Sequence, residues 1–383
     1  MKDTKRALIA SDSTIFRDPR VSKQIEWLID EGWTVDTVGR GPYPSQINGT
    51  HFEMPLRPYV SRVLANLILP NGARYRHVVE SNIPEPLRST PLQHPYDLAV
   101  LNEIELLPWF TRNHRNLVRP GARIHLDLHE FSPSQRTGLL FQLVFKRYRG
   151  WMTTFIPSSI FTSRTVVAPG VADLYTELFG FEKPAVVRNC PPYVDIEPSS
   201  VDPADIKLVH HGGAVTARGL DSLIEAMESI DNRFSLHLML VGSPRIIGRL
   251  KRKAAKFGQR VTFHEPVPMD QVAQALNRFD AEVIFYPPTS ENMRLSLPNK
   301  FFESIQGRLG LITGESPEME TLIREHGFGS VASGWEYASL AAHINSITAD
   351  QISAMKAASH KAAPTLSAES ERHAFLLALG APA

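Results

Sequence analysis

The sequence predicts an α/β protein with two doubly wound domains. Short apolar runs alternate with segments whose apolar residues recur at helical spacing over most of the 383 residues. A chain of this length accommodates roughly two or three domains. The proline-rich, acidic stretch 191–205 is the predicted linker between domains 1–190 and 206–365. Residues 366–383 are expected to form a C-terminal helix that packs back on the first domain.

Composition and charge exclude several classes of protein. The 41 Lys and Arg against 40 Asp and Glu leave a net charge of +1, which argues against a nucleic-acid partner. Cys190 is the only cysteine, so an intrachain disulfide and a cysteine-based zinc cluster are both excluded. The apolar run after Arg6 is too short for a signal peptide or a membrane span, and we expect a cytoplasmic protein.

The first domain opens with the pattern strand, loop, helix, strand. Residues 7–10 form a short apolar run, and the polar loop 11–20 follows it. Apolar residues at helical spacing then continue to a stop at Gly32, and residues 33–38 alternate as a second strand does. Further predicted strands are 98–101, 124–128, 165–168 and 185–187.

Polar side chains follow two of these strands directly. Asn102, Glu103 and Glu105 follow the strand 98–101, and His129 and Glu130 follow 124–128. In open parallel sheets, ligands bind beyond the carboxyl ends of the strands. We therefore expect a functional role for His129, although an isolated histidine is more often structural.

The second domain opens with a glycine-rich loop. An apolar run passes through His210 and His211 into residues 212–219, and helical spacing begins at Leu220. Glycines let the backbone approach a ligand, and Arg218 adds a positive charge beside the helix start. An ordinary turn between strand and helix would contain the same glycines, so the loop alone is weak evidence for a phosphate site.

Strands and helices continue to alternate after this loop. The predicted strands are 236–241, 261–263 and 281–286, and the predicted helices are 249–257 and 269–279. Residues 297–305 then form the densest polar motif, a helix that begins near Pro298. Glu303 in that helix is expected to accept hydrogen bonds from two adjacent hydroxyls, and Lys300 to bind a phosphate. Helix capping would also explain Glu303.

Several of these motifs together resemble retaining glycosyltransferases of the GT-B fold, in the glycogen-synthase-like and mannosyltransferase-like class (family 4 type). The order of the motifs is more specific than any one of them. The matching stretches are 18–21, 129–130, 166–172, 211–219 and 298–303.

The resemblance implies two Rossmann-like domains that face a cleft. It implies transfer of a sugar, of the hexosyl type, from a nucleotide sugar to a hydroxyl of a glycan, a glycolipid or a small-molecule acceptor, without a metal ion or other cofactor and with retention of configuration. The implied catalytic residues are His129, Arg218 and Lys300. The implied donor-binding residues are Gly212, Gly213, Arg218, Gly242, Val267, Asn299, Lys300 and Glu303. The implied acceptor-side residues are Arg17, Asp18, Arg20 and Glu103.

Two positions depart from the family pattern. Gly213 stands where many members have the first of two basic residues, and Arg218 keeps the second. The position eight residues before Glu303 is Leu295, so the E-x7-E pair is incomplete, and Glu291 has the wrong spacing. Two other functions stay open: a sugar-nucleotide epimerase of the same architecture, and a catalytically silent protein that binds nucleotide sugars.

Two basic, apolar stretches suggest an anionic membrane surface as a partner. Residues 54–79 and 131–172 contain no acidic residue, and both lie in the predicted acceptor domain. Reversible binding to the inner face of the membrane would fit a lipid-linked acceptor and polysaccharide biosynthesis. Core helices with solvated basic edges would explain the same pattern.

Overall fold

The chain divides into two compact units. The computed structural model describes residues 5–42, 47–55, 68–88, 91–134, 145–215 and 218–380. One unit contains Met1–Arg188 and Arg372–Ala383, and the other contains Asn189–Glu371. The predicted linker 191–205 therefore belongs to the C-terminal unit in this division.

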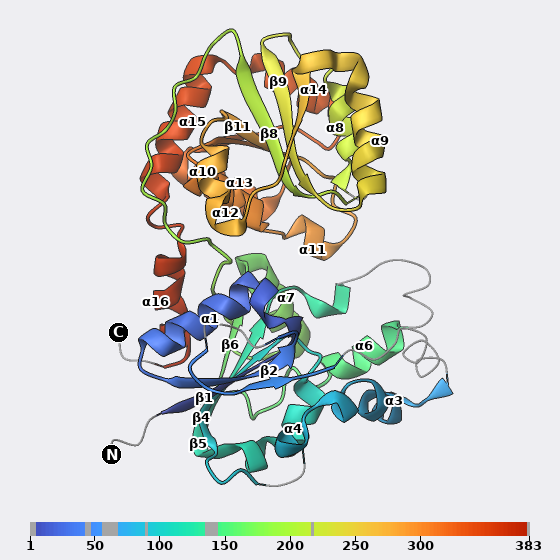
Figure 1. Ribbon diagram of the computed structural model, residues 1–383, viewed down its shortest axis with the longest axis vertical. Coiled ribbons are helices and arrows are strands. Elements are labelled where there is room, and N and C mark those ends of the chain that lie inside the picture. The colour runs from blue at the N-terminus through green and yellow to red at the C-terminus, as the bar shows by residue number, and fades with distance from the viewer. Residues whose placement is uncertain are drawn as a thin grey trace. The chain divides into compact units, whose positions relative to one another are not determined.

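The N-terminal unit is built on a parallel sheet of seven strands. Their order is β3-β2-β1-β4-β5-β6-β7 (Figure 1). The strands are β1 (Arg6–Thr14), β2 (Thr34–Arg40), β3 (His51–Glu53), β4 (Tyr96–Asn102), β5 (Val118–Leu128), β6 (Ser163–Val166) and β7 (Ala185–Val186). The main helices are α1 (Pro19–Asp30), α3 (Asn71–Val78), α4 (Leu107–Leu117), α6 (Lys146–Thr153), α7 (Pro169–Phe179) and α16 (Ala368–Ala378). Helices α1 and α4 lie on opposite faces of this sheet, as double winding requires (Figure 1).

The strand order reverses between β1 and β4, which defines a switch point at the carboxyl edge of the sheet. Ser11 of β1 pairs with Asn102 of β4, and Asn102 pairs with Asp127 of β5. Thr165 of β6 continues the same row. The backbone register therefore places four polar residues side by side at this edge.

The C-terminal unit is built on a parallel sheet of six strands, in the order β10-β9-β8-β11-β12-β13. The strands are β8 (Ile206–Gly213), β9 (Phe234–Val241), β10 (Val261–His264), β11 (Ala281–Ile284), β12 (Gly310–Thr313) and β13 (Gly329–Val331). The helices are α8 (Leu220–Ala226), α9 (Pro244–Ala254), α10 (Val272–Leu276), α11 (Glu291–Arg294), α12 (Asn299–Gln306), α13 (Pro317–His326), α14 (Tyr337–Ser346) and α15 (Ala349–Ala362). Helices α8, α9 and α14 cover one face of the sheet and α10, α12, α13 and α15 the other (Figure 1). The switch point lies between β8 and β11.

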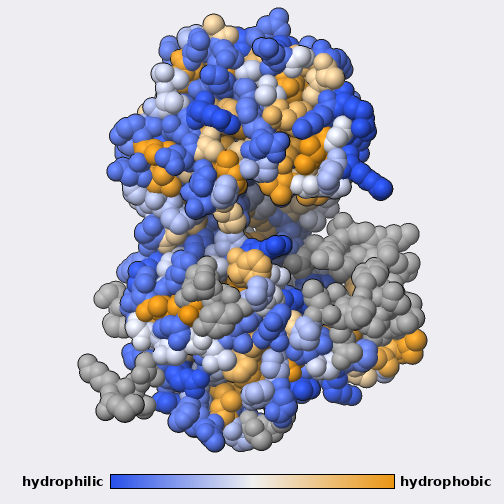
Figure 2. All heavy atoms as spheres, in the orientation of Figure 1, coloured by the Kyte–Doolittle hydropathy of each residue, from blue (hydrophilic) through white to orange (hydrophobic). Residues whose placement is uncertain are grey.

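Helix α9 presents a basic surface. Its last turn contains Lys251, Arg252 and Lys253, and the area over α9 is hydrophilic in Figure 2. Asp221 of α8 accepts a hydrogen bond from Arg249 at 2.7 Å. Exposed pairs of this kind contribute little to stability.

The helix α16 completes the N-terminal unit. Its residues Ala368–Glu371 belong to the C-terminal unit, whereas the part from Arg372 onward belongs to the N-terminal one. Phe375 is fully buried, and its ring lies 5.4 Å from the ring of Trp27 in α1. Arg372 pairs with Glu31 at 2.8 Å.

The two stretches proposed for membrane binding are only partly described. Residues 56–67 and 135–144 lie outside the described residues. In the described parts, Tyr75 and Trp151 pack together at 5.6 Å, and Arg74 is buried over the ring of Tyr148. Arg149 donates to Glu105 at 2.8 Å. Because the aromatic side chains pack on one another, these contacts agree with the second explanation of the two stretches, core helices with solvated basic edges.

Candidate functional site

Lys300 lies at the switch point of the C-terminal unit, where β8 ends. His210 Nδ1 donates to the carbonyl oxygen of Val283 at 2.7 Å, which leaves His210 Nε2 as an acceptor. Lys300 Nζ donates to that Nε2 at 2.8 Å and to the carbonyl oxygen of His211. As an ammonium group, Lys300 therefore keeps one N–H for a ligand. Burial lowers the pKa of Lys300 to about 7.

His211 is held between two carboxylates. Its Nδ1 lies 2.9 Å from Glu282 Oε2, and its Nε2 lies 2.9 Å from Glu303 Oε2. Burial alone would lower the pKa of His211, but Glu282 and Glu303 outweigh it and raise the pKa to about 9. The imidazolium thus fixes one oxygen of Glu303.

Arg218 lies close to the backbone of Gly213, at the glycine-containing end of β8. Gly212 has φ +96°, and a Cβ on it would lie 3.8 Å from Lys300 Nζ. Arg218 Nη1 donates to the carbonyl oxygen of Gly213 at 3.2 Å, and its guanidinium lies 5.9 Å from the centre of the Tyr286 ring. Residues 216–217 are outside the described residues. The site therefore combines two positively charged hydrogen-bond donors, Lys300 and Arg218, with the uncharged backbone donors of the glycines.

The remaining donor-binding predictions lie at neighbouring loops of the same unit. Gly242 follows β9, and a Cβ there would come within 3.0 Å of Ala214 Cβ. Val267 follows β10 and packs partly buried against the cluster that contains Val209. Asn299 Oδ1, at the start of α12, accepts a hydrogen bond from Asn189 Nδ2 at 2.9 Å.

The position that lacks the first glutamate of the family pattern is apolar in structure as well as in sequence. Leu295 is buried, with 4% of its surface exposed. Glu291 is exposed and pairs with Arg294 at 2.8 Å. Neither side chain replaces the missing carboxylate.

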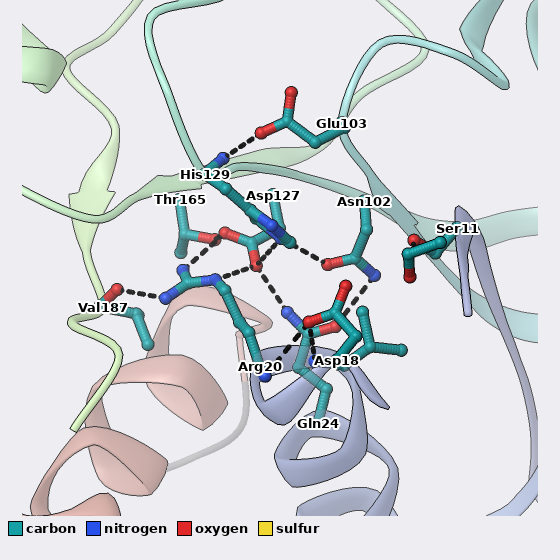
Figure 3. Close-up of polar contacts among 12 residues, drawn as sticks. Ser11, Asp18, Arg20, Gln24, Asn102, Glu103, Asp127, His129, Thr165 and Val187 are labelled. Carbon is teal, nitrogen blue, oxygen red and sulfur yellow. Dashed lines mark hydrogen bonds and ion pairs between the residues drawn. The ribbon is translucent and has the colours of Figure 1, made fainter. Parts of the chain in front are cut away.

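Asp127 is the centre of the polar cluster in the N-terminal unit (Figure 3). Arg20 of α1 donates to both oxygens of Asp127 at 2.6 Å, and Thr165 Oγ1 donates to Oδ1 at 2.7 Å. Burial by itself would raise the pKa of Asp127, but Arg20 outweighs it and holds this pKa well below its usual range. Asp127 is therefore an ionised, fully buried carboxylate.

His129 lies at the edge of this cluster with 21% of its side chain exposed. Its Nε2 lies 2.9 Å from Asn102 Oδ1 and 3.4 Å from Asp127 Oδ2. Burial opposes a charge on the ring, but Asp127 outweighs it and raises the pKa of His129. The contact with Asp127 therefore stabilises the charged form of this ring.

Glu103 supports the backbone beside His129. It has an unusual φ of 65°, and its Oε1 accepts the backbone N–H of His129 at 2.6 Å and that of Glu130 at 3.2 Å. Ser132 Oγ donates to its other oxygen at 3.3 Å. Burial raises the pKa of Glu103 to about 7. Its contacts are those of a residue that shapes the loop.

The structure changes the interpretation of the predicted acceptor-side residues. Arg20 has 4% of its surface exposed, and its guanidinium also donates to the carbonyl oxygen of Val187 at 2.6 Å. It is therefore a buried ion-pair partner, and we no longer assign it a contact with the acceptor substrate. Asp18 caps α1, because its side chain accepts from the backbone N–H of Arg20 and Val21. Arg17 is exposed beside the ring of Phe16 and is still compatible with a contact to substrate.

Sequence reasoning missed Gln24, Asp127 and Glu282 as members of these clusters. Asp127 is a charged residue in the buried last part of β5, and Glu282 is a charged residue in the otherwise apolar β11. Gln24 is a polar residue on the buried side of α1. Buried polar groups need partners, so each was a signal for a polar cluster.

Among the described residues, no three His, Cys, Asp or Glu side chains lie together as a metal site would require. The metal-independent reaction stays a prediction. Within the same ranges, no helix has both the length and the apolar character needed to cross a bilayer.

Solved structures with this fold include several glycosyltransferases. Sucrose-phosphate synthase from Thermosynechococcus elongatus has a TM-score of 0.68 and 15% identity, and the match covers 97% of each chain. WaaG, a glycosyltransferase involved in lipopolysaccharide biosynthesis, has a TM-score of 0.66 and 14% identity over 98% of this chain and 100% of its own. The E. coli trehalose-6-phosphate structure bound with UDP-2-fluoro glucose has a TM-score of 0.66 and 10% identity, over 99% of this chain and 100% of its own. No curated protein sequence matches the chain.

Together, the two parallel sheets and these neighbours define a protein of the GT-B fold, with two Rossmann-like domains, as the motifs predicted. Residues 205–350 match the family Glycosyl transferases group 1. The C-terminal unit therefore contains a group 1 glycosyltransferase domain, and all the proposed donor-binding residues lie within it.

Proposed function

We propose that this protein transfers a glycosyl group from a nucleoside-diphosphate sugar to a hydroxyl of an acceptor, with retention of configuration. The observation that carries the proposal is the group formed by Lys300, Arg218 and Glu303 at the switch point of a group 1 domain. Open α/β sheets bind nucleotides at such switch points.

Lys300 and Arg218 would bind the diphosphate. Lys300 offers one remaining N–H close to Gly212, where the absence of a Cβ lets an anion approach. As the bond between the anomeric carbon and the diphosphate oxygen breaks, negative charge increases on the leaving group. Positive groups already in place stabilise that charge without a metal ion in this proposal.

Glu303 would hold the ribose. His211 occupies its Oε2, and Oε1 is the oxygen left for a hydroxyl. Because His211 is itself bound by Glu282, the carboxylate of Glu303 is fixed in one orientation.

In the proposed reaction, the acceptor hydroxyl attacks the anomeric carbon on the face that the diphosphate leaves. Its proton passes to an oxygen of the departing diphosphate, so no protein nucleophile is needed. His129 would contact a reacting sugar. We propose a hexosyl donor, because a structure with this fold is bound with UDP-2-fluoro glucose. We also propose a glycan or lipid-linked acceptor, because WaaG, with the same fold, is involved in lipopolysaccharide biosynthesis.

A screen of nucleotide sugars by thermal shift tests the proposal. A ligand at a hundred times its dissociation constant adds about 2.7 kcal/mol of stability. The donor found in this way is then incubated with glycan acceptors, and release of nucleoside diphosphate together with a glycosylated acceptor is the expected result. Epimerised donor, or binding without turnover of any acceptor, would favour the two other functions.

Glu303→Gln tests the ribose site directly. We expect at least tenfold weaker donor binding with an unchanged fold, because the amide replaces one acceptor oxygen with a donor. Glu291→Gln is the matched control, since Glu291 is exposed and contacts Arg294. Unchanged nucleotide affinity and turnover in Glu303→Gln would contradict the assignment.

A further inference from the structure

In the polar cluster of the N-terminal unit, Arg20 determines which group is the donor and which the acceptor in each successive hydrogen bond (Figure 3). Arg20 is a donor only, and both oxygens of Asp127 accept from it. The same arginine keeps the pKa of Asp127 low, so this carboxylate is ionised and accepts from all its neighbours.

This direction passes through two amides to His129. The group of Gln24 that lies 2.5 Å from Asp127 Oδ2 must donate, so it is Nε2, and Oε1 faces Asn102 at 2.9 Å. Asn102 therefore donates through Nδ2 and turns its Oδ1 toward His129 Nε2. The only atom of His129 that satisfies an acceptor there is an Nε2 that holds a hydrogen.

Asp127 also contacts the ring directly, at a longer distance than Asn102 does. Its Oδ2 is the second acceptor near His129 Nε2, at 3.4 Å. Two acceptors thus converge on Nε2, whereas Nδ1 has no hydrogen-bond partner among the residues that the structure describes.

We propose that Gln24 and Asn102 are positioning residues that hold His129 in the Nε2–H form, so that Nδ1 is the atom offered to substrate. Nε2 keeps its hydrogen in both the neutral and the charged ring. The proton that titrates is therefore on Nδ1.

This assignment defines what His129 does in the proposed glycosyl transfer, and that role rests on the proposed function. When the ring is neutral, Nδ1 accepts a hydrogen bond from a sugar hydroxyl. When the ring is charged, Nδ1 donates to a sugar or phosphate oxygen. Rotation of the ring is opposed because it would leave Asn102 Oδ1, which is fully buried, without its donor.

Nitrogen-15 NMR of the unliganded, histidine-labelled protein tests the assignment. The His129 signals are identified by their loss in His129→Gln. At alkaline pH we expect an unprotonated Nδ1 and a protonated Nε2, and on acidification Nδ1 is the nitrogen that gains a proton. A neutral His129 with its hydrogen on Nδ1, or an equal mixture of the two forms, would overturn the proposal. No substrate is present, so the result does not depend on the proposed activity.

Asn102→Leu tests the positioning role. We expect a mixture of the two ring forms and a fall in kcat of about tenfold or more, with unchanged affinity for the nucleotide. Asn113→Leu is the matched control, because it removes one amide hydrogen bond, from Nδ2 to the carbonyl oxygen of Trp109, elsewhere in the same unit. An unchanged ring form and kcat in Asn102→Leu would refute the role. If this variant fails to fold, Asn102→Asp keeps an acceptor for Nε2 and must retain the Nε2–H form.

Discussion

Replacing Lys300 changes the number of protons that the protein takes up with a nucleoside diphosphate. Burial lowers the pKa of Lys300 to about 7, and a nearby diphosphate favours the ammonium form and raises this pKa again. At pH 8 a group with a pKa of about 7 is roughly 90% neutral, so binding should take up about 0.9 proton. The complex binds more protons than the free protein, so affinity should fall by up to about tenfold per pH unit above pH 7.

Isothermal titration calorimetry at pH 8 in two buffers of different ionisation enthalpy measures this proton number. Lys300→Met should abolish the uptake and weaken binding. Lys251→Met is the matched control, because Lys251 is exposed over the ring of Phe263 in the same unit. Binding by the wild-type protein without proton uptake, or with the same affinity from pH 7 to pH 9, would refute the reasoning.

Three further predictions follow from the same contacts. Arg218→Ala should reduce turnover by about 10²–10³, because it removes a charge that stabilises the leaving group; a purified variant with normal turnover would exclude that role. His211→Gln should lower the free energy of unfolding by about 3 kcal/mol below pH 6.5, the usual pKa of an unfolded histidine. Because the folded pKa is raised to about 9, this difference should vanish as pH rises through 9, and chemical denaturation that shows no pH trend would contradict it. Lys146→Gln with Arg147→Gln should reduce co-sedimentation with anionic vesicles if these exposed residues bind membranes; equal partition onto neutral and anionic vesicles would favour an acceptor in solution.

The strands were predictable because buried parallel strands are continuous apolar runs. Residues 98–101 and 236–241 lie within β4 and β9. Helix limits were less predictable: the helix expected at 249–257 begins at Pro244, where proline fits a first turn. The helix expected at 269–279 is a 3₁₀ turn followed by α10. The apolar pattern of a short segment indicates which side of the helix is buried, but not whether the helix is of the α or the 3₁₀ type.

The candidate sites were predictable only in part. Motif order singled out Lys300 and Glu303 after Pro298 at a helix start, Arg218 after a glycine turn and His129 after a strand, and their functional roles stay predictions. The partners that set the charges come from far away in the chain: Glu282 of β11 lies 71 residues after His211, and Arg20, which keeps Asp127 ionised, lies 107 residues before it. Spacing along one strand does not specify such partners. Whether a basic, aromatic stretch such as 145–155 faces solvent or other aromatic rings also depends on tertiary packing.

The position of α16 has a consequence for biosynthesis. Phe375 and Arg372 contact α1, yet Arg372 is translated 341 residues after its partner Glu31. The N-terminal unit thus waits for α16 before Trp27 is covered. A nascent chain, or one cut after Glu371, exposes this apolar surface to chaperones and proteases even though its first 188 residues are complete.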